Sequence, residues 1–145
     1  MPRASIASRA NKNAPTHCGG NAKEIGYECK GRGGWFVGHY HESCHPILAS
    51  YVVEMKWGVH GARESRCDWD KGRPEWSLSV LIRGNFSIEF ADKTYPLTKR
   101  GDFVIWGPGV PHTWRANARS VILTVRWRER KYVGARSSGH RPRDP

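Results

Sequence analysis

The sequence predicts an all-β fold, a small antiparallel β-barrel of the jelly-roll kind. Short runs of β-branched and aromatic residues recur along the chain, and glycine- and proline-rich turns separate them. No segment carries an apolar stripe at helical spacing that is long enough to indicate a helix. The 145 residues suit one domain, which can bury a core without a metal or a disulfide.

Seven or eight short strands are expected. The first is residues 35–40, and the second is residues 51–60, where an apolar face (Val53, Met55, Trp57, Val59) alternates with a polar face (Glu54, Lys56, Gly58, His60). Either face of the second strand could line a barrel interior, and the pattern leaves that choice open. A turn-rich stretch, residues 61–76, follows. Further strands are expected at residues 77–83, 86–90, 94–97, 102–106, 112–116 and 120–127.

The net charge of +11 is concentrated at the two ends of the chain. Both ends are rich in Ser, Gly, Pro and Arg and have no hydrophobic periodicity, so we expect flexible basic segments at residues 1–30 and 131–145 around a folded domain at 31–130. Such tails are usually solvated, and nucleic acid is not the expected partner. No apolar run is long enough for a membrane helix and no secretory signal is apparent, which favours a cytoplasmic protein without a membrane partner.

A glycine-rich motif stands between two of the expected strands. In Gly101-Asp-Phe-Val-Ile-Trp-Gly-Pro-Gly109-Val-Pro-His112, the glycines permit tight turns and the following strand begins with histidine. This motif resembles the second signature of the cupin superfamily, with Gly107 in the usual proline place. The segment Leu81-Ile-Arg-Gly84-Asn-Phe-Ser-Ile-Glu-Phe90 resembles the end of the first cupin signature. The resemblance covers roughly residues 50–127 and implies a small single-domain cupin, with His112 directed into the barrel mouth.

The first cupin signature is degenerate in this chain. The resemblance implies that its glutamate and its two histidines would stand at Ser77, Cys67 and Trp69, so that only His112 remains of the usual metal ligands. A substitute site of His60, Glu75 and His112 would satisfy a two-histidine, one-carboxylate centre for iron, manganese or zinc. The alternative, which we favour, is a metal-free pocket in which both histidines are hydrogen-bonded. The cofactor is therefore left open, with none as the preferred hypothesis.

Strand alternation predicts the rest of the pocket. If His112 points inward, Trp114 does too, and the inward set before Gly84 is Ser77, Ser79, Leu81 and Arg83. We expect His112 to be the catalytic residue and the following residues to bind substrate: Ser77, Ser79, Arg83, Trp69 and Trp114.

A second cluster, His39, His41, Cys44 and His45, has soft metal ligands but reads as a surface loop ended by Pro46. The four cysteines have neither redox-pair nor zinc-knuckle spacing, so free thiols are expected.

Two functions remain open. The chain is expected to bind a small polar or anionic molecule, either as an enzyme or as a non-catalytic ligand-binding or sensory module. The enzyme would be a metal-dependent lyase, isomerase or oxygenase, or a metal-free isomerase with His112 as general acid and base. We also expect a homodimer, because an open jelly roll leaves strand edges and the chain carries seven tryptophans.

We predict that the chain ends contribute little to stability. Deleting residues 1–20 and 133–145 should change the melting temperature by only a few degrees, on the order of 1 kcal/mol or less, because neither end carries a periodic apolar face. Thermal unfolding monitored by circular dichroism checks this. Loss of cooperative folding would show that the domain boundary lies further out.

Overall fold

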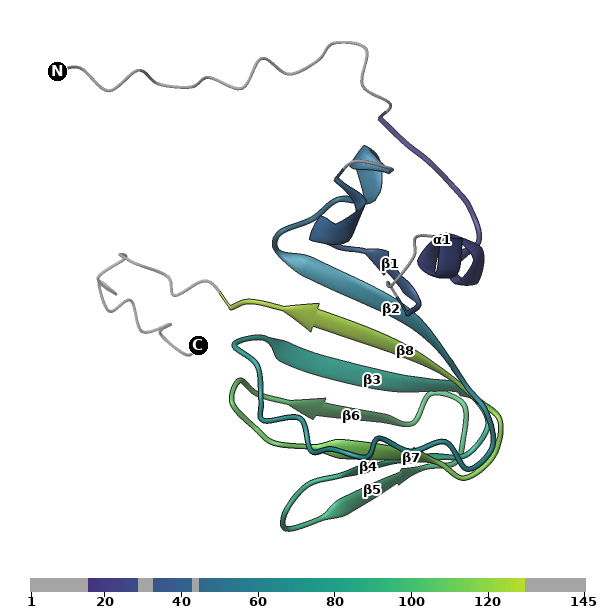
Figure 1. Cartoon of the computed structure of the whole chain (residues 1–145), viewed down its shortest axis with the longest axis vertical. Helices are drawn as coiled ribbons and strands as arrows, with labels where there is room; N and C mark the ends of the chain where they lie inside the picture. The colour runs from purple at the N-terminus through teal and green to yellow at the C-terminus, as the bar shows by residue number, and fades with distance from the viewer. Residues whose placement is uncertain (1–15, 29–32, 43–44, 130–145) are drawn as a thin grey trace, which may run out of the picture.

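The fold consists of two antiparallel β-sheets that face each other (Figure 1). It is seen in a computed structural model that describes residues 16–28, 33–42 and 45–129. The larger sheet has the strand order β1-β2-β8-β3-β6 and the smaller has the order β5-β4-β7. The strands are β1 (Trp35–Val37), β2 (Val53–His60), β3 (Trp76–Arg83), β4 (Phe86–Glu89), β5 (Thr94–Leu97), β6 (Phe103–Trp106), β7 (Thr113–Ala116) and β8 (Ser120–Trp127). The prediction of an all-β fold of antiparallel strands is confirmed.

The core lies between the two sheets. Its buried apolar side chains come from both of them: Leu81, Phe86, Ile88, Leu97, Val104, Trp106, Ala116 and Ile122. Their burial on the facing sides of the sheets supplies the main hydrophobic stabilisation of the sandwich.

The polar face of β2 points into the space between the sheets. Lys56, Gly58 and His60 line a cavity there, while Trp57 and Val59 lie on the opposite side of the strand. The sequence left the orientation of this strand open, and in the structure its polar face points inward. The consequence is a polar interior at the β2–β8 side of the sandwich, next to the apolar core.

The alternation expected along β3 holds as far as Leu81. Ser77, Ser79 and Leu81 are buried, but Arg83 is exposed and borders a groove on the outer face of the larger sheet. The register between β3 and β8 shifts between Leu81 and Arg83, and such an irregularity moves the residues after it to the other face. The expectation that Arg83 points inward is therefore corrected.

The N-terminal part differs from the expectation in two places. The helix α1 (Ala22–Glu28) lies within the segment expected to be flexible, where it contacts β1 and β2. Asn21 begins this helix, since its side-chain oxygen accepts hydrogen bonds from the amides of Lys23 and Glu24. Seven residues are too few to produce a recognisable helical period in the sequence.

The expected strand at residues 35–40 ends at Val37. Two short 3-10 helices follow, η1 (His39–His41) and η2 (Pro46–Leu48). The fully buried His41 connects η1 to β1, since its Nε2 donates a hydrogen bond to the carbonyl of Trp35 at 2.9 Å. The strand β1 pairs with β2 of the same chain.

The turn-rich stretch after β2 extends the smaller sheet. Residues 63–70 run antiparallel to β7, and backbone hydrogen bonds join Arg63 to Ala116 and Ala116 to Glu64. At its far end Asp70 and His112 exchange two backbone hydrogen bonds of 2.8 and 3.2 Å. This irregular segment is therefore held at the mouth of the sandwich by main-chain contacts.

No helix in the part of the chain that the structure describes is both long and apolar enough to cross a membrane.

We predict that Gly84→Ala destabilises the fold more than Gly101→Ala. Both glycines have positive φ, 109° and 92°, where an alanine is strained by about 1–3 kcal/mol. A Cβ at Gly84 would also collide with the Ser120 hydroxyl and the Arg119 carbonyl, whereas Gly101 has open space around it. Urea unfolding should show a further loss of about 1–3 kcal/mol in the Gly84 variant. Equal losses in the two variants would contradict this packing.

Candidate functional site

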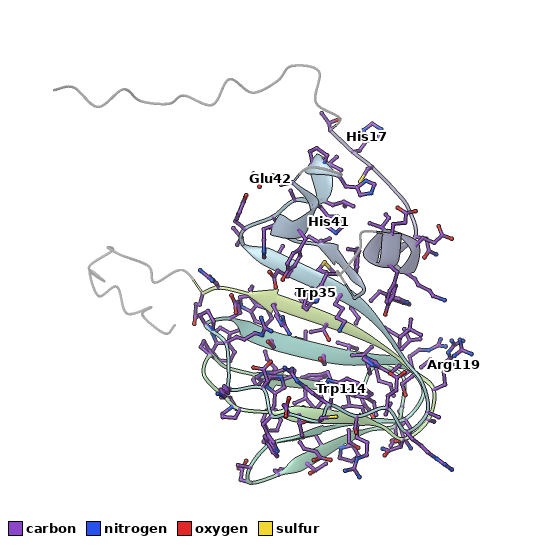
Figure 2. All side chains as sticks on the ribbon, viewed as in Figure 1. His17, Trp35, His41, Glu42, Trp114 and Arg119 are labelled. Atoms are coloured by element: carbon purple, nitrogen blue, oxygen red, sulfur yellow. The ribbon has the colours of Figure 1, made fainter. Side chains whose placement is uncertain are left out.

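A cavity of about 90 Å³ lies between the two sheets. Aromatic and aliphatic side chains form its base: Phe86, Ile88, Trp106, Trp114 and Ile122. Its polar lining is Lys56, His60, Arg66, Ser79, His112, Thr124 and Arg126, together with Gly58. Trp114 lies between the sheets, and Trp35 lies toward the β1 end of the larger sheet (Figure 2). A mainly apolar base with a few convergent polar side chains is the lining typical of a ligand site.

His112 begins the chain segment that enters β7 and is buried at the cavity wall. Its ring centroid lies 4.6 Å from that of Trp106. Its Nδ1 lies 3.2 Å from the carbonyl oxygen of Val110. A carbonyl can only accept, so Nδ1 carries the proton of the neutral ring and Nε2 keeps its lone pair. In this tautomer the Nε2 atom of His112 can accept a proton, so the cavity contains a base.

His60, at the end of β2, is the second imidazole of the cavity. Its ring centroid lies 4.4 Å from that of Trp114 and 5.2 Å from that of Phe86. Its Nδ1 lies 3.6 Å from Oε2 of Glu64, a residue on the segment that pairs with β7. Aromatic packing holds this ring in place on two sides.

Burial lowers the pKa of both histidines. For His112, the hydrogen bond to Val110 and the charge of Asp70 oppose this effect without reversing it. For His60, the charge of Lys56 adds to the effect of burial and Glu64 opposes it. Both rings are therefore neutral at pH 7 and available as proton acceptors.

Arg126 is a largely enclosed cation of the cavity, with only 13% of its side chain exposed. Its guanidinium lies 4.4 Å from the ring centroid of Trp35 and 3.9 Å from Oε2 of Glu54. Among the residues that the structure describes, the buried Nε has no hydrogen-bond acceptor. A buried donor without an acceptor is destabilising, and an anion in the cavity would supply one.

Lys56 lies on the same wall and faces the cavity. Its ammonium is 5.8 Å from the ring centroid of Trp35. Within the described residues no carboxylate lies at ion-pair distance from it. Burial, and then the charges of Arg126 and Arg66, lower the pKa of Lys56. The cavity thus concentrates positive charge, and none of its described lining residues is acidic.

Arg66 is positioned by the buried Asp70. The Arg66 guanidinium donates a hydrogen bond of 3.0 Å to Asp70, which also accepts one from the amide of Gly72 at 3.0 Å and contacts Arg73 at 3.5 Å. Burial opposes ionisation of Asp70, but the Gly72 amide, His112 and the two arginines outweigh it and lower its pKa. A charged Asp70 therefore keeps Arg66 at the cavity mouth.

The structure brings together four of the residues expected at the site. His60, Ser79, His112 and Trp114 line the one cavity, and Ser79 shares a 2.9 Å hydrogen bond with Thr124. Ser77 is buried on the same face of β3 but does not line the cavity.

Three expected residues lie elsewhere. Trp69 is exposed on the segment that pairs with β7, and Arg83 is on the outer face. Glu75 accepts a 3.1 Å hydrogen bond from Arg128 and lines a separate recess, which also includes Tyr51 and touches Arg126.

The proposed metal site does not fit the lining of the cavity. His60 and His112 face it, but Glu75, the third expected ligand, does not. A cupin metal centre needs about three or four converging ligands, and here two imidazoles share the space with three cationic side chains. Across the described ranges, no group of three or more His, Cys, Asp or Glu side chains is arranged to hold a metal ion.

The histidines near the N-terminus have partners of their own. His39 contacts Glu54 at 3.1 Å, His45 contacts Glu28 at 3.8 Å, and His41 is bonded to the Trp35 carbonyl. Cys44 and Cys29 lie outside the described residues. The described cysteines, Cys18 and Cys67, are free and exposed, as expected.

Three cationic residues of the cavity, Arg126, Lys56 and Arg66, were not among the site residues expected from the sequence. One signal could have identified Arg126 and Lys56, because polar residues alternate in three neighbouring strands of the larger sheet. These residues are Lys56 and His60 in β2, Ser77 and Ser79 in β3, and Thr124 and Arg126 in β8.

The chain is similar in structure to cupins. A cupin superfamily protein from Desulfitobacterium hafniense is 18% identical, with a TM-score of 0.50 over 55% of this chain and 71% of that chain. KdgF from Halomonas sp. is 12% identical, with a TM-score of 0.51 over 58% of this chain and 77% of that chain. A conserved protein of unknown function from Streptococcus pyogenes is 16% identical, with a TM-score of 0.50 over 57% of this chain and 70% of that chain.

The sequence matches no protein-family model, and it matches no curated protein. The similarity to solved structures, together with the paired antiparallel sheets, shows that this chain has the cupin fold. The resemblance found in the glycine-rich motif is confirmed at the level of the fold.

We predict that stability declines as pH falls below about 6.5, the ordinary pKa of histidine. The folded chain holds His60 and His112 with lowered pKa values, so the unfolded chain binds these protons first and stability is lost through that range. Asp70 acts in the same direction, but only below its ordinary value of 3.8. Urea unfolding between pH 5 and 8 measures this slope.

The double variant His60→Gln, His112→Gln is the control for this prediction. It removes both imidazoles, so its stability between pH 5 and about 6.5 should be nearly flat. An unchanged slope in the variant would contradict the assignment to these two rings.

Proposed function

We propose that the protein binds a small anionic molecule in the cavity between the sheets and uses His112 as the base of a metal-free proton transfer. The observation that carries the proposal is the environment of Arg126 and Lys56. One has a buried Nε without an acceptor, and the other has no carboxylate at ion-pair distance among the described residues. Carboxylate or phosphate oxygens would satisfy both groups with charge-assisted hydrogen bonds.

The size of the cavity supports a ligand with few atoms. About 90 Å³ is smaller than the roughly 150 Å³ of an engineered protein cavity that accepts benzene. The anionic group would bind at Arg126 and Lys56, and Trp106 and Trp114 would pack against its carbon atoms. The hydroxyl groups of Ser79 and Thr124 add neutral donors and acceptors at the same wall.

His112 supports a reaction of the lyase or isomerase kind. Its Nε2 would take a proton from a carbon next to the carboxylate or carbonyl group, and the charge left on the substrate oxygen would be stabilised by Lys56, Arg66 and Arg126. Returning the proton to another carbon gives isomerisation, and loss of a leaving group gives elimination. The lowered pKa of His112 keeps its base form populated at pH 7.

The alternative is a binding module without catalysis. The same cations would then recognise the anion, and His112 would only donate or accept a hydrogen bond. One observation favours it, since the ring is held by Trp106 and Val110 as a buried structural histidine would be.

We predict that Lys56→Met weakens anion binding at least about tenfold, because it removes a half-buried charge from the cavity. Calorimetric titration with acetate and with inorganic phosphate measures this, and acetamide is the neutral comparison. The control is Lys93→Met, which removes an exposed lysine that packs on Tyr95 in the other sheet. Equal affinities for acetate and acetamide, or equal losses in both variants, would overturn the proposal.

We predict that His112→Gln separates the two functions. Small 2-oxo and 3-oxo carboxylates incubated with the protein in D₂O should exchange the carbon-bound proton, as measured by proton NMR. The variant should exchange at least about tenfold more slowly while retaining anion binding and staying within about 1–2 kcal/mol of the parent in folding stability. Anion binding without any exchange in the parent would leave the non-catalytic function in its place.

A further inference from the structure

We propose that the recess beside the cavity binds a second anionic group of the ligand, so that the molecule which this protein takes is an organic dianion. The inference rests on the proposed function, because it places the first anionic group at Lys56 and Arg126. The recess has a volume of about 420 Å³, and its lining includes Arg73, Arg126 and Arg128. The second group is a carboxylate or a phosphate, which arginine side chains bind through the same paired hydrogen bonds.

Arg126 connects the recess with the cavity. Its side chain lines both spaces, and only 13% of it is exposed. Among the described residues its Nε has no acceptor, and Oε2 of Glu54 lies 3.9 Å from its Nη1, which is too far for a hydrogen bond. The guanidinium can therefore donate to a ligand that extends from the cavity into the recess.

The end of β8 places a second arginine further along the recess. Arg126 lies in β8 and Arg128 lies one residue beyond its end, and both line the recess. Two residues of extended chain span about 7 Å. Anionic groups bound to these two guanidinium groups are therefore joined by a chain of several carbon atoms.

Arg128 and Arg73 are each held through one nitrogen. Nε of Arg128 donates a 3.1 Å hydrogen bond to Glu75, and Nε of Arg73 lies 3.5 Å from Oδ2 of Asp70. Within the described ranges, the terminal nitrogens of both side chains make no hydrogen bond. A guanidinium has five N–H donors, so both side chains are oriented and still present donors to the two oxygens of a carboxylate or to a phosphate.

Positive charge exceeds negative charge around these two connected spaces. Five cations line them, and three carboxylates lie beside the cations: Lys56, Arg66, Arg73, Arg126 and Arg128 against Glu54, Asp70 and Glu75. Burial, and then the charge of Arg73, lower the pKa of Arg126, so these two guanidinium groups are close enough to repel each other. Counted over these groups, the excess is two positive charges, which matches the charge of a dianion.

Aromatic rings complete the lining of the recess. The ring centroid of His39 lies 3.9 Å from that of Tyr40 and 6.3 Å from that of Tyr51. Nδ1 of His39 lies 3.1 Å from Glu54, which orients the imidazole. The carbon chain between the two anionic groups packs against these rings, so an organic dianion makes contacts that an inorganic one lacks.

Calorimetric titration of the full chain with adipate and with its monomethyl ester tests the inference. The two molecules share one carbon chain and differ by one charge. We expect adipate to bind at least about tenfold more tightly, because the ester brings no second charge to the recess. Arg128→Met should abolish this difference with little change in the affinity for acetate, since Arg128 lines the recess and not the cavity.

The matched control is Arg115→Met. Arg115 is 61% exposed and Arg128 is 66% exposed, and each contacts one glutamate, Glu89 and Glu75 respectively. The control should keep the preference for adipate, and circular dichroism should show the parent fold in both variants. A further titration with 5-phosphonopentanoate identifies the second group, because tighter binding than adipate assigns the recess to a phosphate and weaker binding assigns it to a carboxylate.

Three results would contradict the inference. Equal affinities for adipate and its ester, with acetate still bound, would overturn it and leave the proposed function intact. Equal losses of adipate affinity in Arg128→Met and Arg115→Met would also overturn it. If the parent bound neither adipate nor acetate, the inference and the proposed function would both be wrong.

Discussion

The placement of the polar face of β2 and β8 toward the space between the sheets is the constraint on which the rest of the structure depends. Lys56, His60 and Arg126 are thereby held in a partly buried region beside the hydrophobic core. Burial of charge is unfavourable unless it is compensated, and the compensation that the described residues provide is incomplete. Glu54 lies 3.9 Å from Arg126, and Trp35 packs against its guanidinium, but no described residue supplies an acceptor for the buried Nε.

The same groups connect stability with function. Burial lowers the pKa of Lys56 and of both cavity histidines, so each of them is less favourable in its charged form than in water. The free-energy cost of burying these groups is offset by the apolar side chains on the facing strands: Leu81, Phe86, Ile88 and Val104. Buried ionisable groups of this kind reduce stability and are typical of functional sites. This is the reason to interpret the cavity as a ligand site.

The strands were predictable because their signals are local. A period of two in residues 120–127 and a glycine turn at Gly101 or Gly109 depend only on nearby residues, and the strands lie within a few residues of the expected positions. The orientation of β2 depends on what covers each side of the sheet, which its own alternation does not encode. Arg83 was misplaced because a register shift between strands leaves no mark in either sequence, and Glu75 was assigned by alternation beyond the start of β3.

Part of the site was predictable for the same reason. His112 follows a motif whose glycines and prolines determine the turn geometry. Arg126 and Arg66 reach the cavity only because β8 and the segment at residues 63–70 pair with strands that are distant in the sequence. Asp70, which holds Arg66, is itself positioned by backbone contacts to His112 that are remote in sequence.

The segment that pairs with β7 has a consequence for how this protein can diverge. Its hydrogen bonds to Ala116, Trp114 and His112 run through the main chain, so they survive changes of most of its side chains. Exposed residues such as Cys67 and Trp69 can therefore be substituted while the backbone keeps Arg66 at the cavity mouth. Replacing Arg66 during evolution would alter the charge at the cavity mouth and leave the main-chain hydrogen bonds of the sandwich in place. A change of ligand preference therefore requires few substitutions.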